Sequence, residues 1–128
     1  MREIKFRAWD KERKEILYAR KAVIFAWIED KPKFIIPMQY TGLKDKNGKE
    51  IYEGDIIKNG RLIQKVYFEL NESCYKIKCL NCYDKNGSML RDLRLIIDKE
   101  VEVIGNIYEN PKLLGIKQEL ENENFKLN

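Results

Sequence analysis

The chain has 128 residues, of which 36% are charged and 44% are hydrophobic, and its formal net charge is +4. A chain of this length is expected to form one domain, and it buries roughly two-thirds of its unfolded surface, which is enough for an independent core. It has no apolar stretch of about 18 residues, which excludes a membrane-spanning helix, and its first residues lack the apolar region of a secretory signal. Three cysteines, an odd set, suit a reducing compartment. We therefore expect a globular protein of the cytoplasm with no membrane partner.

The positive charge is concentrated in the middle of the chain. Residues 31–97 carry 13 basic and 8 acidic side chains, a net charge of +5, whereas residues 98–128 carry 4 and 7, a net charge of −3. A basic body with an acidic end is compatible with nucleic-acid binding. A lysine-rich solvated surface without that role produces the same pattern, so charge alone leaves both interpretations open.

The first residues show mainly strand patterns. Residues 4–8 alternate apolar and basic side chains, which predicts a half-buried strand with Arg7 on its polar face. Residues 16–19 predict a hairpin partner after a charged connection. Residues 22–28 are apolar without a clean period, and we interpret them as a strand rather than as a short helix.

A break follows at residues 30–33, and the apolar pattern resumes at residues 34–36. Pro37 has no backbone N–H to donate, so it restricts this strand to an edge or an end. The N-terminal region is therefore expected to be β structure up to about residue 40.

Residues 38–58 combine turn chemistry with alternating apolar residues. The sequence Asp-Lys-Asn-Gly at residues 45–48 predicts a turn, because Asn and Gly tolerate positive φ and the Asp side chain bonds the backbone ahead. The sequence Glu-Gly-Asp at residues 53–55 predicts a second turn, and residues 56–57 begin a new apolar run. So much local specification indicates one well-defined structure.

An Asn-Gly pair at residues 59–60 separates alternating runs at residues 55–58 and 62–70. Such a pair is among the strongest short-range signals of a hairpin. Residues 74–82 predict another strand, and residues 84–87 repeat the Asp-Lys-Asn-Gly turn.

The end of the chain mixes helix and strand patterns. Residues 88–97 are ambiguous, although their apolar side chains have helical spacing. Residues 100–108 predict a strand. Asn110 is expected to cap a short helix with Pro111 in its first turn, and residues 121–128 are polar.

These elements predict a mainly β fold in a single domain, residues 1–128. We expect a small SH3-like or twisted-sheet barrel formed by roughly residues 50–108, with one or two short helices. The expected parts are an N-terminal β segment (1–40), a barrel-like core (41–110) and a short C-terminal helix and tail (111–128).

Three blocks of the chain carry a family resemblance: KFRAWDK at residues 5–11, a central block that runs from QYTGLKD at residues 39–45 through Asp55, and VIGNIYENP at residues 103–111. In this order they resemble the YopX family, whose members are small proteins encoded by bacteriophages and prophages. The resemblance spans nearly the whole chain. It implies a phage or prophage origin and carries no catalytic residue over to this sequence, because the family has no established activity.

Catalytic chemistry has few candidates. The chain contains no histidine, which removes the commonest general base and metal ligand. Carboxylates at Asp45, Glu50, Glu53 and Asp55 lie close together in sequence, so carboxylate-dependent catalysis is a remote alternative. Turn formation and solvation explain the same residues, and we expect no enzyme activity.

Metal sites are also not expected. Residues 45–56 have the length of a calcium loop, but Lys49 and Ile56 stand where oxygen ligands are needed. Cys79 and Cys82 form a C-x-x-C pair, yet a structural zinc site takes four ligands, so we interpret these cysteines as small core residues. No cofactor is expected.

Basic and aromatic residues interleave in the predicted strands after residue 57. Lysines neutralise phosphates and exposed aromatic rings stack on bases, while a solvated strand surface is the alternative interpretation. On a two-residue period Lys65, Tyr67 and Glu69 share one face, and Lys76 and Lys78 share another. The candidate nucleic-acid residues are Lys58, Arg61, Lys65, Tyr67, Lys76 and Lys78.

The favoured hypothesis is a non-enzymatic phage accessory protein that binds a host or phage protein, with homo-oligomer formation left open. Loops on a rigid scaffold commonly carry recognition, so the candidate binding residues come from the central loop: Lys44, Asp45, Asn47, Glu53 and Asp55. A nucleic-acid-binding regulatory protein with a basic β face is the alternative.

Overall fold

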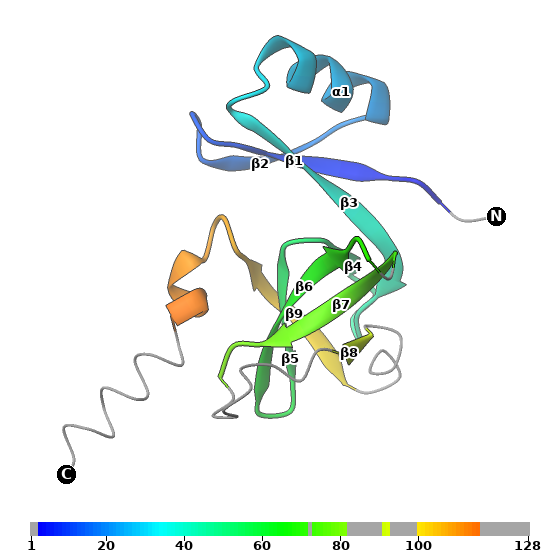
Figure 1. Ribbon diagram of the computed structural model, residues 1–128, viewed down its shortest axis with the longest axis vertical. Helices are drawn as coiled ribbons and strands as arrows, with labels where there is room; N and C mark the ends of the chain where they lie inside the picture. The colour runs from blue at the N-terminus through cyan, green and yellow to red at the C-terminus, as the bar shows by residue number, and fades with distance from the viewer. Residues whose placement is uncertain (1–2, 72, 82–90, 93–99, 116–128) are drawn as a thin grey trace.

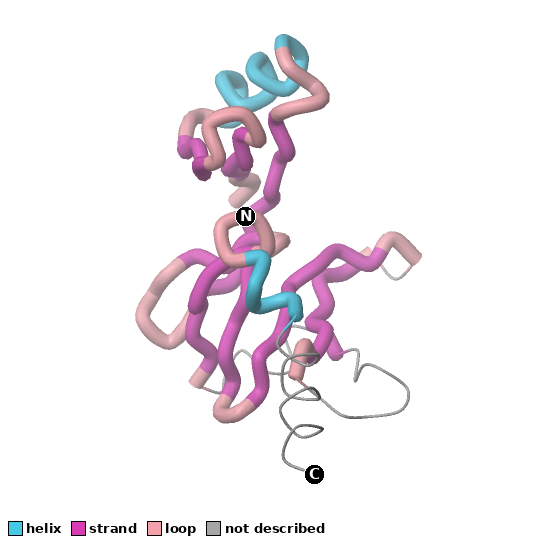
Figure 2. The backbone as a smooth tube through the Cα atoms, turned by 90° about the vertical axis from the view of Figure 1, so that its left-hand side faces the viewer, coloured by secondary structure: helices cyan, strands magenta, loops and turns pink. Residues whose placement is uncertain are grey.

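The computed structural model describes residues 3–71, 73–81, 91–92 and 100–115. Within these residues the fold has two parts, a four-stranded sheet covered by one helix and a strongly curled five-stranded sheet (Figure 1). Strand β3 runs from the first part towards the second, and the curl of the second sheet is visible in the perpendicular view (Figure 2). The predicted mainly β, twisted-sheet barrel class is confirmed.

The four-stranded sheet is antiparallel with the strand order β2-β1-β3-β4. The predicted hairpin at the start of the chain is confirmed, since β1 pairs with β2. The elements of this part are β1 (Phe6–Asp10), β2 (Glu15–Tyr18), α1 (Lys21–Asp30), β3 (Ile35–Lys44) and β4 (Glu50–Tyr52).

The strand predicted at residues 22–28 is wrong, because this segment is the helix α1. Ile24 is fully buried on β1, and Trp27 and Ile28 pack in the same cluster, which is the i, i+3, i+4 spacing of one helix face. Val23, Phe25 and Ala26 are apolar but exposed, so the sequence shows no contrast between the two faces.

Arg7 is the second correction in this part. The alternation in residues 4–8 predicts a solvent-facing Arg7, but the side chain is buried. β1 is a central strand with α1 over one face and the second sheet near the other, so both of its faces are covered. A strand covered on both faces does not follow the alternation of a half-buried strand.

Pro37 lies inside β3 rather than at its end, and the strand continues to Lys44. Its pairing explains how the proline is tolerated. Residues 35–39 pair with β1, and the pairing with β4 begins only at Tyr40. The predicted edge position therefore holds for the Pro37 half of the strand.

The curled sheet is antiparallel with the strand order β8-β7-β6-β5-β9. A short 3-10 helix with Pro111 as its first residue follows β9, as predicted, but the Asn110 side chain accepts a hydrogen bond from the Asn106 amide at 3.1 Å and does not cap that helix. The elements are β5 (Asp55–Asn59), β6 (Leu62–Glu69), β7 (Cys74–Cys79), β8 (Arg91–Asp92), β9 (Val101–Asn106) and the 3-10 helix (Pro111–Gly115).

The three turns predicted by residues 45–48, 53–55 and 59–60 are confirmed. Gly48, Gly54 and Gly60 all have positive φ, as these turns require. The Asn-Gly hairpin is tight, since Asn59 on β5 is directly paired with Leu62 on β6. Local turn chemistry therefore fixes the path of the chain between residues 44 and 62.

Some predictions fall wholly or partly outside the described residues. The turn at residues 84–87 and the polar end at 121–128 lie there. Residues 88–97, which the sequence leaves ambiguous, contain the strand β8 at Arg91 and Asp92, and the rest of that segment lies outside the described residues.

The curled sheet encloses the main core. Its inner residues Ile57, Val66, Ile77 and Val101 are fully buried, and Ile51 from β4 closes the same cluster. Burying a side chain of this size contributes about 1.5–3 kcal/mol. β4 thus belongs to the first sheet by pairing and to the second by packing.

Cys79 is buried, as the core interpretation predicts, but it also forms a disulfide, which that interpretation does not include. Cys74 is free. In the described part of the chain, no helix is long and apolar enough to cross a membrane.

Candidate nucleic-acid interface

The register of β6 and β7 brings together residues that the sequence places on separate strands. Lys65 lies directly opposite Lys78, and Tyr67 lies directly opposite Lys76. Residues directly opposite each other in an antiparallel pair project from the same face, about 4.5–5.5 Å apart at Cβ. All four side chains therefore lie on one face of the curled sheet.

This face is the outer one. Val66 and Ile77, which alternate with these residues, point into the core enclosed by the curl. Lys58 on β5 also projects from this side of the sheet, but Ile56 and Ile63, which lie between it and Lys65, are buried with Ile104, Ile107 and Leu113. We define the basic face as Lys58, Lys65, Tyr67, Lys76 and Lys78.

The basic face is uneven in charge, since Glu69 of β6 lies on the same face and the register sets Asp92 of β8 opposite Lys76. Lys58 lies opposite Glu102 of β9, a carboxylate that also forms an ion pair with Lys46 at 3.8 Å. At that end the positive charge is therefore partly balanced. Around Lys65 and Lys78 two cations stand directly opposite each other, and such like-charge pairs oppose folding. A bound anion would remove that repulsion.

The side chains of the basic face differ in exposure. Lys58 and Lys78 are exposed, whereas Lys65, Tyr67 and Lys76 are half-buried. The Lys65 ammonium lies 6.0 Å from the centre of the Tyr67 ring. Arg61, the other candidate, is exposed in the turn between β5 and β6.

The central-loop candidates do not form one surface. Asp45 is buried and accepts hydrogen bonds from the amides of Asn47 (2.8 Å), Lys49 (2.9 Å) and Val103 (3.0 Å). Burial raises the pKa of Asp45, but these hydrogen bonds outweigh it and hold the pKa below its usual value. Asp45 thus closes the turn and anchors it to β9, while Lys44 and Asn47 remain exposed.

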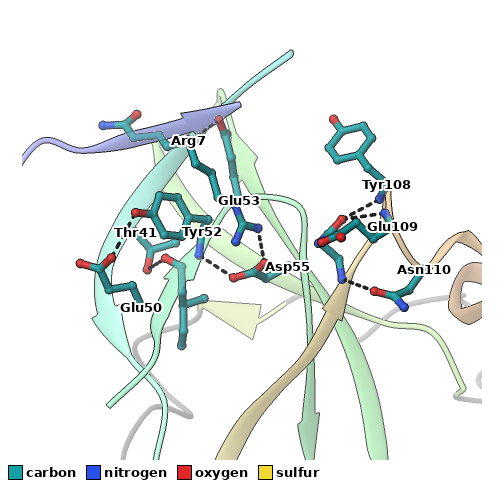
Figure 3. Close-up of polar contacts among 12 residues, drawn as sticks. Arg7, Thr41, Glu50, Tyr52, Glu53, Asp55, Tyr108, Glu109 and Asn110 are labelled. Carbon is teal, nitrogen blue, oxygen red and sulfur yellow. Dashed lines mark hydrogen bonds and ion pairs between the residues drawn. The ribbon is translucent and has the colours of Figure 1, made fainter. Parts of the chain in front are cut away.

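Asp55 is also committed to the fold. Its Oδ1 accepts a hydrogen bond from the buried Arg7 guanidinium, and its Oδ2 accepts one from the Tyr52 amide at 2.8 Å (Figure 3). The Arg7 guanidinium also lies 4.5 Å from the centre of the Tyr52 ring. Arg7 was missed by the sequence analysis because the alternation of its strand assigns it to solvent.

Glu53 occupies a different position from the other loop residues. It lines a cleft of about 250 Å³ between β3, the 53–54 turn, β6 and the segment after β9. Lys65 and Tyr67 of the basic face line the same cleft. Its other walls are Pro37, Met38, Gly54, Val66, Phe68, Ile107 and Tyr108.

Glu53 is held in place by two hydrogen bonds to one residue of β3. Its amide donates to the Gln39 carbonyl, and its Oε1 accepts from the Gln39 amide, each at 2.9 Å. Burial raises the pKa of Glu53 more than the Gln39 amide lowers it. The pKa of Tyr108, across the cleft, is also raised, first by burial and then by the Glu53 charge.

The four carboxylates of the loop bond different parts of the fold. Asp45 bonds β9, and Asp55 bonds β1. Glu50 forms an ion pair with Lys5 at 2.8 Å, and Glu53 bonds β3. Among the described residues, no three His, Cys, Asp or Glu side chains are grouped so that they could hold a metal ion.

Comparisons with known proteins agree with this architecture. The model of a family described as "YopX protein" matches residues 24–115. The chain is similar to the crystal structure of protein EF1440 from Enterococcus faecalis, with a TM-score of 0.56 and 25% sequence identity. That alignment covers 89% of this chain and 99% of the other. No curated protein matches the chain.

Proposed function

The chain belongs to the YopX family, and we propose that it is a non-enzymatic phage or prophage accessory protein that binds single-stranded nucleic acid through its basic face. The observation that carries this proposal is the register of β6 and β7, which sets Lys65 opposite Lys78 and Tyr67 opposite Lys76. On sequence alone a protein partner was the favoured hypothesis. The convergence of three cations and one aromatic ring on one face reverses that order.

The chemistry of the face favours a single strand over a duplex. Lysines contribute charge without reading sequence, and an aromatic ring between them offers a stacking platform for an unpaired base. A duplex keeps its bases stacked inside the helix, so Tyr67 would have no base to contact. We expect the cytoplasm of the host bacterium to be the compartment of this activity.

Fluorescence anisotropy with a labelled oligothymidine of about 12 nucleotides, within the site sizes of small binding folds, tests the proposal. We expect binding that weakens as salt rises, with a slope of about −0.7 in log K against log salt for each phosphate neutralised. The same oligonucleotide in a duplex should bind more weakly.

A double variant Lys65→Gln/Lys78→Gln should lower the affinity and flatten the salt slope. The matched control is Lys11→Gln/Lys33→Gln, which removes two exposed lysines from the first part of the fold. Equal affinities of the two double variants, or no binding of the wild-type protein at low salt, would reject the proposal.

A protein partner is the second candidate, and exposed apolar side chains on the first part of the fold favour it. Tyr18 is 67% exposed, and Phe25 and Phe34 are each 40% exposed. Large exposed apolar side chains that gather in a patch mark interaction sites. Self-association through them would give the homo-oligomer left open by the sequence.

Sedimentation equilibrium over a range of protein concentrations tests self-association, with Tyr18→Ser/Phe25→Ser as the variant. A host or phage partner is tested by cross-linked pull-down with the same variant and with Lys44→Ala/Asn47→Ala, which alters the exposed loop residues. The protein-partner candidate would be rejected if the protein is a monomer at all concentrations and the wild type and both double variants capture identical partners.

A further inference from the structure

The cleft lined by Glu53 begins where the basic face ends. Lys65 and Tyr67 belong to both, so a single-stranded nucleic acid bound along β6 passes the mouth of the cleft. At about 250 Å³ the cleft is smaller than the pockets of roughly 300–1,000 Å³ that hold drug-sized ligands. That size suits one flat ring better than a whole nucleotide.

The walls of the cleft have the chemistry that recognises an unstacked base. Tyr67, Phe68 and Tyr108 supply aromatic surface, and single-stranded nucleic acids are read by stacking on such rings and by hydrogen bonds to the base edges. Glu53 is the one carboxylate among the lining residues. An ionised carboxylate only accepts hydrogen bonds, so it selects for donors on the base.

The position of Glu53 is fixed before any ligand binds. The paired bonds with Gln39 hold its backbone and its Oε1. The neighbouring Gly54 donates its amide to the Val66 carbonyl at 2.8 Å, which fixes the turn to β6. Among the described residues, Oε2 of Glu53 accepts no hydrogen bond, so acceptor capacity remains at a half-buried carboxylate.

The four bases differ in the donors that they offer to a carboxylate. Guanine presents two adjacent donors on its Watson–Crick edge, the ring N1–H and the 2-amino group. Adenine and cytosine each place one amino group beside an acceptor nitrogen. Thymine and uracil place their single N–H between two carbonyl oxygens, which repel a carboxylate. Guanine is therefore the best match and thymine the poorest.

We propose that the Glu53 cleft binds the base of a guanine in single-stranded nucleic acid, with Glu53 accepting from its Watson–Crick edge and the tyrosines contacting its ring. This proposal rests on the proposed function, since the basic face must hold the strand. It adds a preference for one base to a surface that otherwise binds without regard to sequence.

The test compares three oligonucleotides in the anisotropy assay: oligothymidine, the same chain with one central guanine, and the same chain with one central hypoxanthine, which lacks the 2-amino group. We expect the guanine chain to bind about 5- to 150-fold more tightly than oligothymidine, the range for a good two-bond base contact. Hypoxanthine, with one donor fewer, should fall between them.

The variant Glu53→Gln should abolish the preference for guanine, while its affinity for oligothymidine stays the same or rises slightly. The matched control is Glu69→Gln, which removes one negative charge from the outer face of β6 without touching the cleft. That control should retain the guanine preference. Urea unfolding of each variant checks that the fold is intact.

A second variant serves if Glu53→Gln does not fold. Phe68 lines the cleft and is 39% exposed, so Phe68→Ala should be tolerated, and it should weaken the guanine chain more than oligothymidine.

The outcomes separate this inference from the proposed function. Salt-dependent binding of all three oligonucleotides with equal affinity would overturn the guanine site but would still support nucleic-acid binding by the basic face. A guanine preference that survives in Glu53→Gln would also overturn it, because the readout would then lie elsewhere. No binding of any oligonucleotide at low salt would overturn both.

Discussion

Arg7 on β1 and Asp55 on β5 form a buried ion pair between the two sheets, with side-chain exposures of 4% and 1%. They are 48 residues apart in sequence. The Tyr52 amide of β4 donates a hydrogen bond to the second oxygen of Asp55 (Figure 3). The contact therefore joins the four-stranded sheet to the curled sheet through two buried side chains.

Removing one partner of the pair should destabilise the fold strongly. We expect Arg7→Met or Asp55→Asn to lower the free energy of unfolding by about 3–5 kcal/mol, because each leaves a buried group without its partner. The double variant should lose less unfolding free energy than the sum of the two single variants. Urea unfolding of the wild type, the two single variants and the double variant gives the coupling free energy between Arg7 and Asp55.

The exposed pair Lys31–Glu12, at 3.2 Å, is the control for this cycle. Lys31→Gln should change the unfolding free energy by less than about 1 kcal/mol, as is usual for a solvated ion pair. Strictly additive effects at Arg7 and Asp55 would show that the two side chains act independently and that the contact does not join the sheets.

Gly54 and Gly48 differ in the space around them, which predicts different costs for an added methyl group. Both have positive φ, +86° and +79°, so alanine at either site should cost about 1–2 kcal/mol from backbone strain. At Gly54 a Cβ would also lie 3.0 Å from Met38 Cε, whereas at Gly48 nothing lies within 4 Å.

We therefore expect Gly54→Ala to be the more destabilising of the two, by up to about 1–3 kcal/mol from overpacking. The difference should fall towards the lower end, because the Met38 side chain is flexible. Thermal or urea unfolding of both variants measures it. Equal losses would mean that Met38 moves aside at no cost.

The Asp45 turn should make stability depend on pH in the acid range. The folded pKa of Asp45 is below its usual value, so its contribution is present above the unfolded pKa of about 3.9 and is lost as pH falls through the folded pKa. Asp45→Asn should cost about 1–3 kcal/mol at neutral pH through lost hydrogen bonding. The gap between wild type and variant, measured by urea unfolding, should narrow below about pH 4.

Glu53 should change stability with pH in the direction opposite to Asp45, so it serves as the internal control. Its folded pKa is raised by burial, so the wild-type protein loses stability as pH rises from the unfolded pKa of about 4.3 through the folded value. Relative to Glu53→Gln, the wild type should therefore be most stable at acid pH. The same trend at Asp45 and Glu53 would contradict the hydrogen-bond assignment of at least one of them.

The turns of this fold were predictable because their signals are local. Residues 45–48, 53–55 and 59–60 carry Gly, Asn and Asp at positions that only a few turn types accept, and the structure has turns at all three. The helix α1 was not predictable by period, since Phe25 is as apolar as the buried Ile24 beside it. A helical period is visible only when one face is apolar and the other polar, and the exposed apolar residues of α1 remove that difference.

The candidate site was predictable in its residues but not in its geometry. Lys65 and Lys78 are both visible as basic residues in strand patterns, yet whether they share a face depends on the register of β6 and β7. A slip of one residue would place them on opposite faces. Arg7 was assigned to solvent and Tyr108 to a strand, because their partners Asp55 and Trp9 lie far away in the sequence and are brought near only by packing.

Tyr67 provides the prediction that separates stacking from charge on the basic face. Replacing it with alanine removes a ring without changing the net charge, so affinity for oligothymidine should fall about 5- to 150-fold while the salt slope is unchanged. Lys65→Gln should instead reduce the slope. Tyr18→Ala, at an exposed tyrosine on the first part of the fold, is the control and should leave affinity and slope unaltered. Because a duplex offers no unpaired base, Tyr67→Ala should barely change duplex binding. Equal losses for single strand and duplex in the anisotropy assay would mean that Tyr67 supports the face structurally, by packing beneath Lys65, and that no base stacks on it.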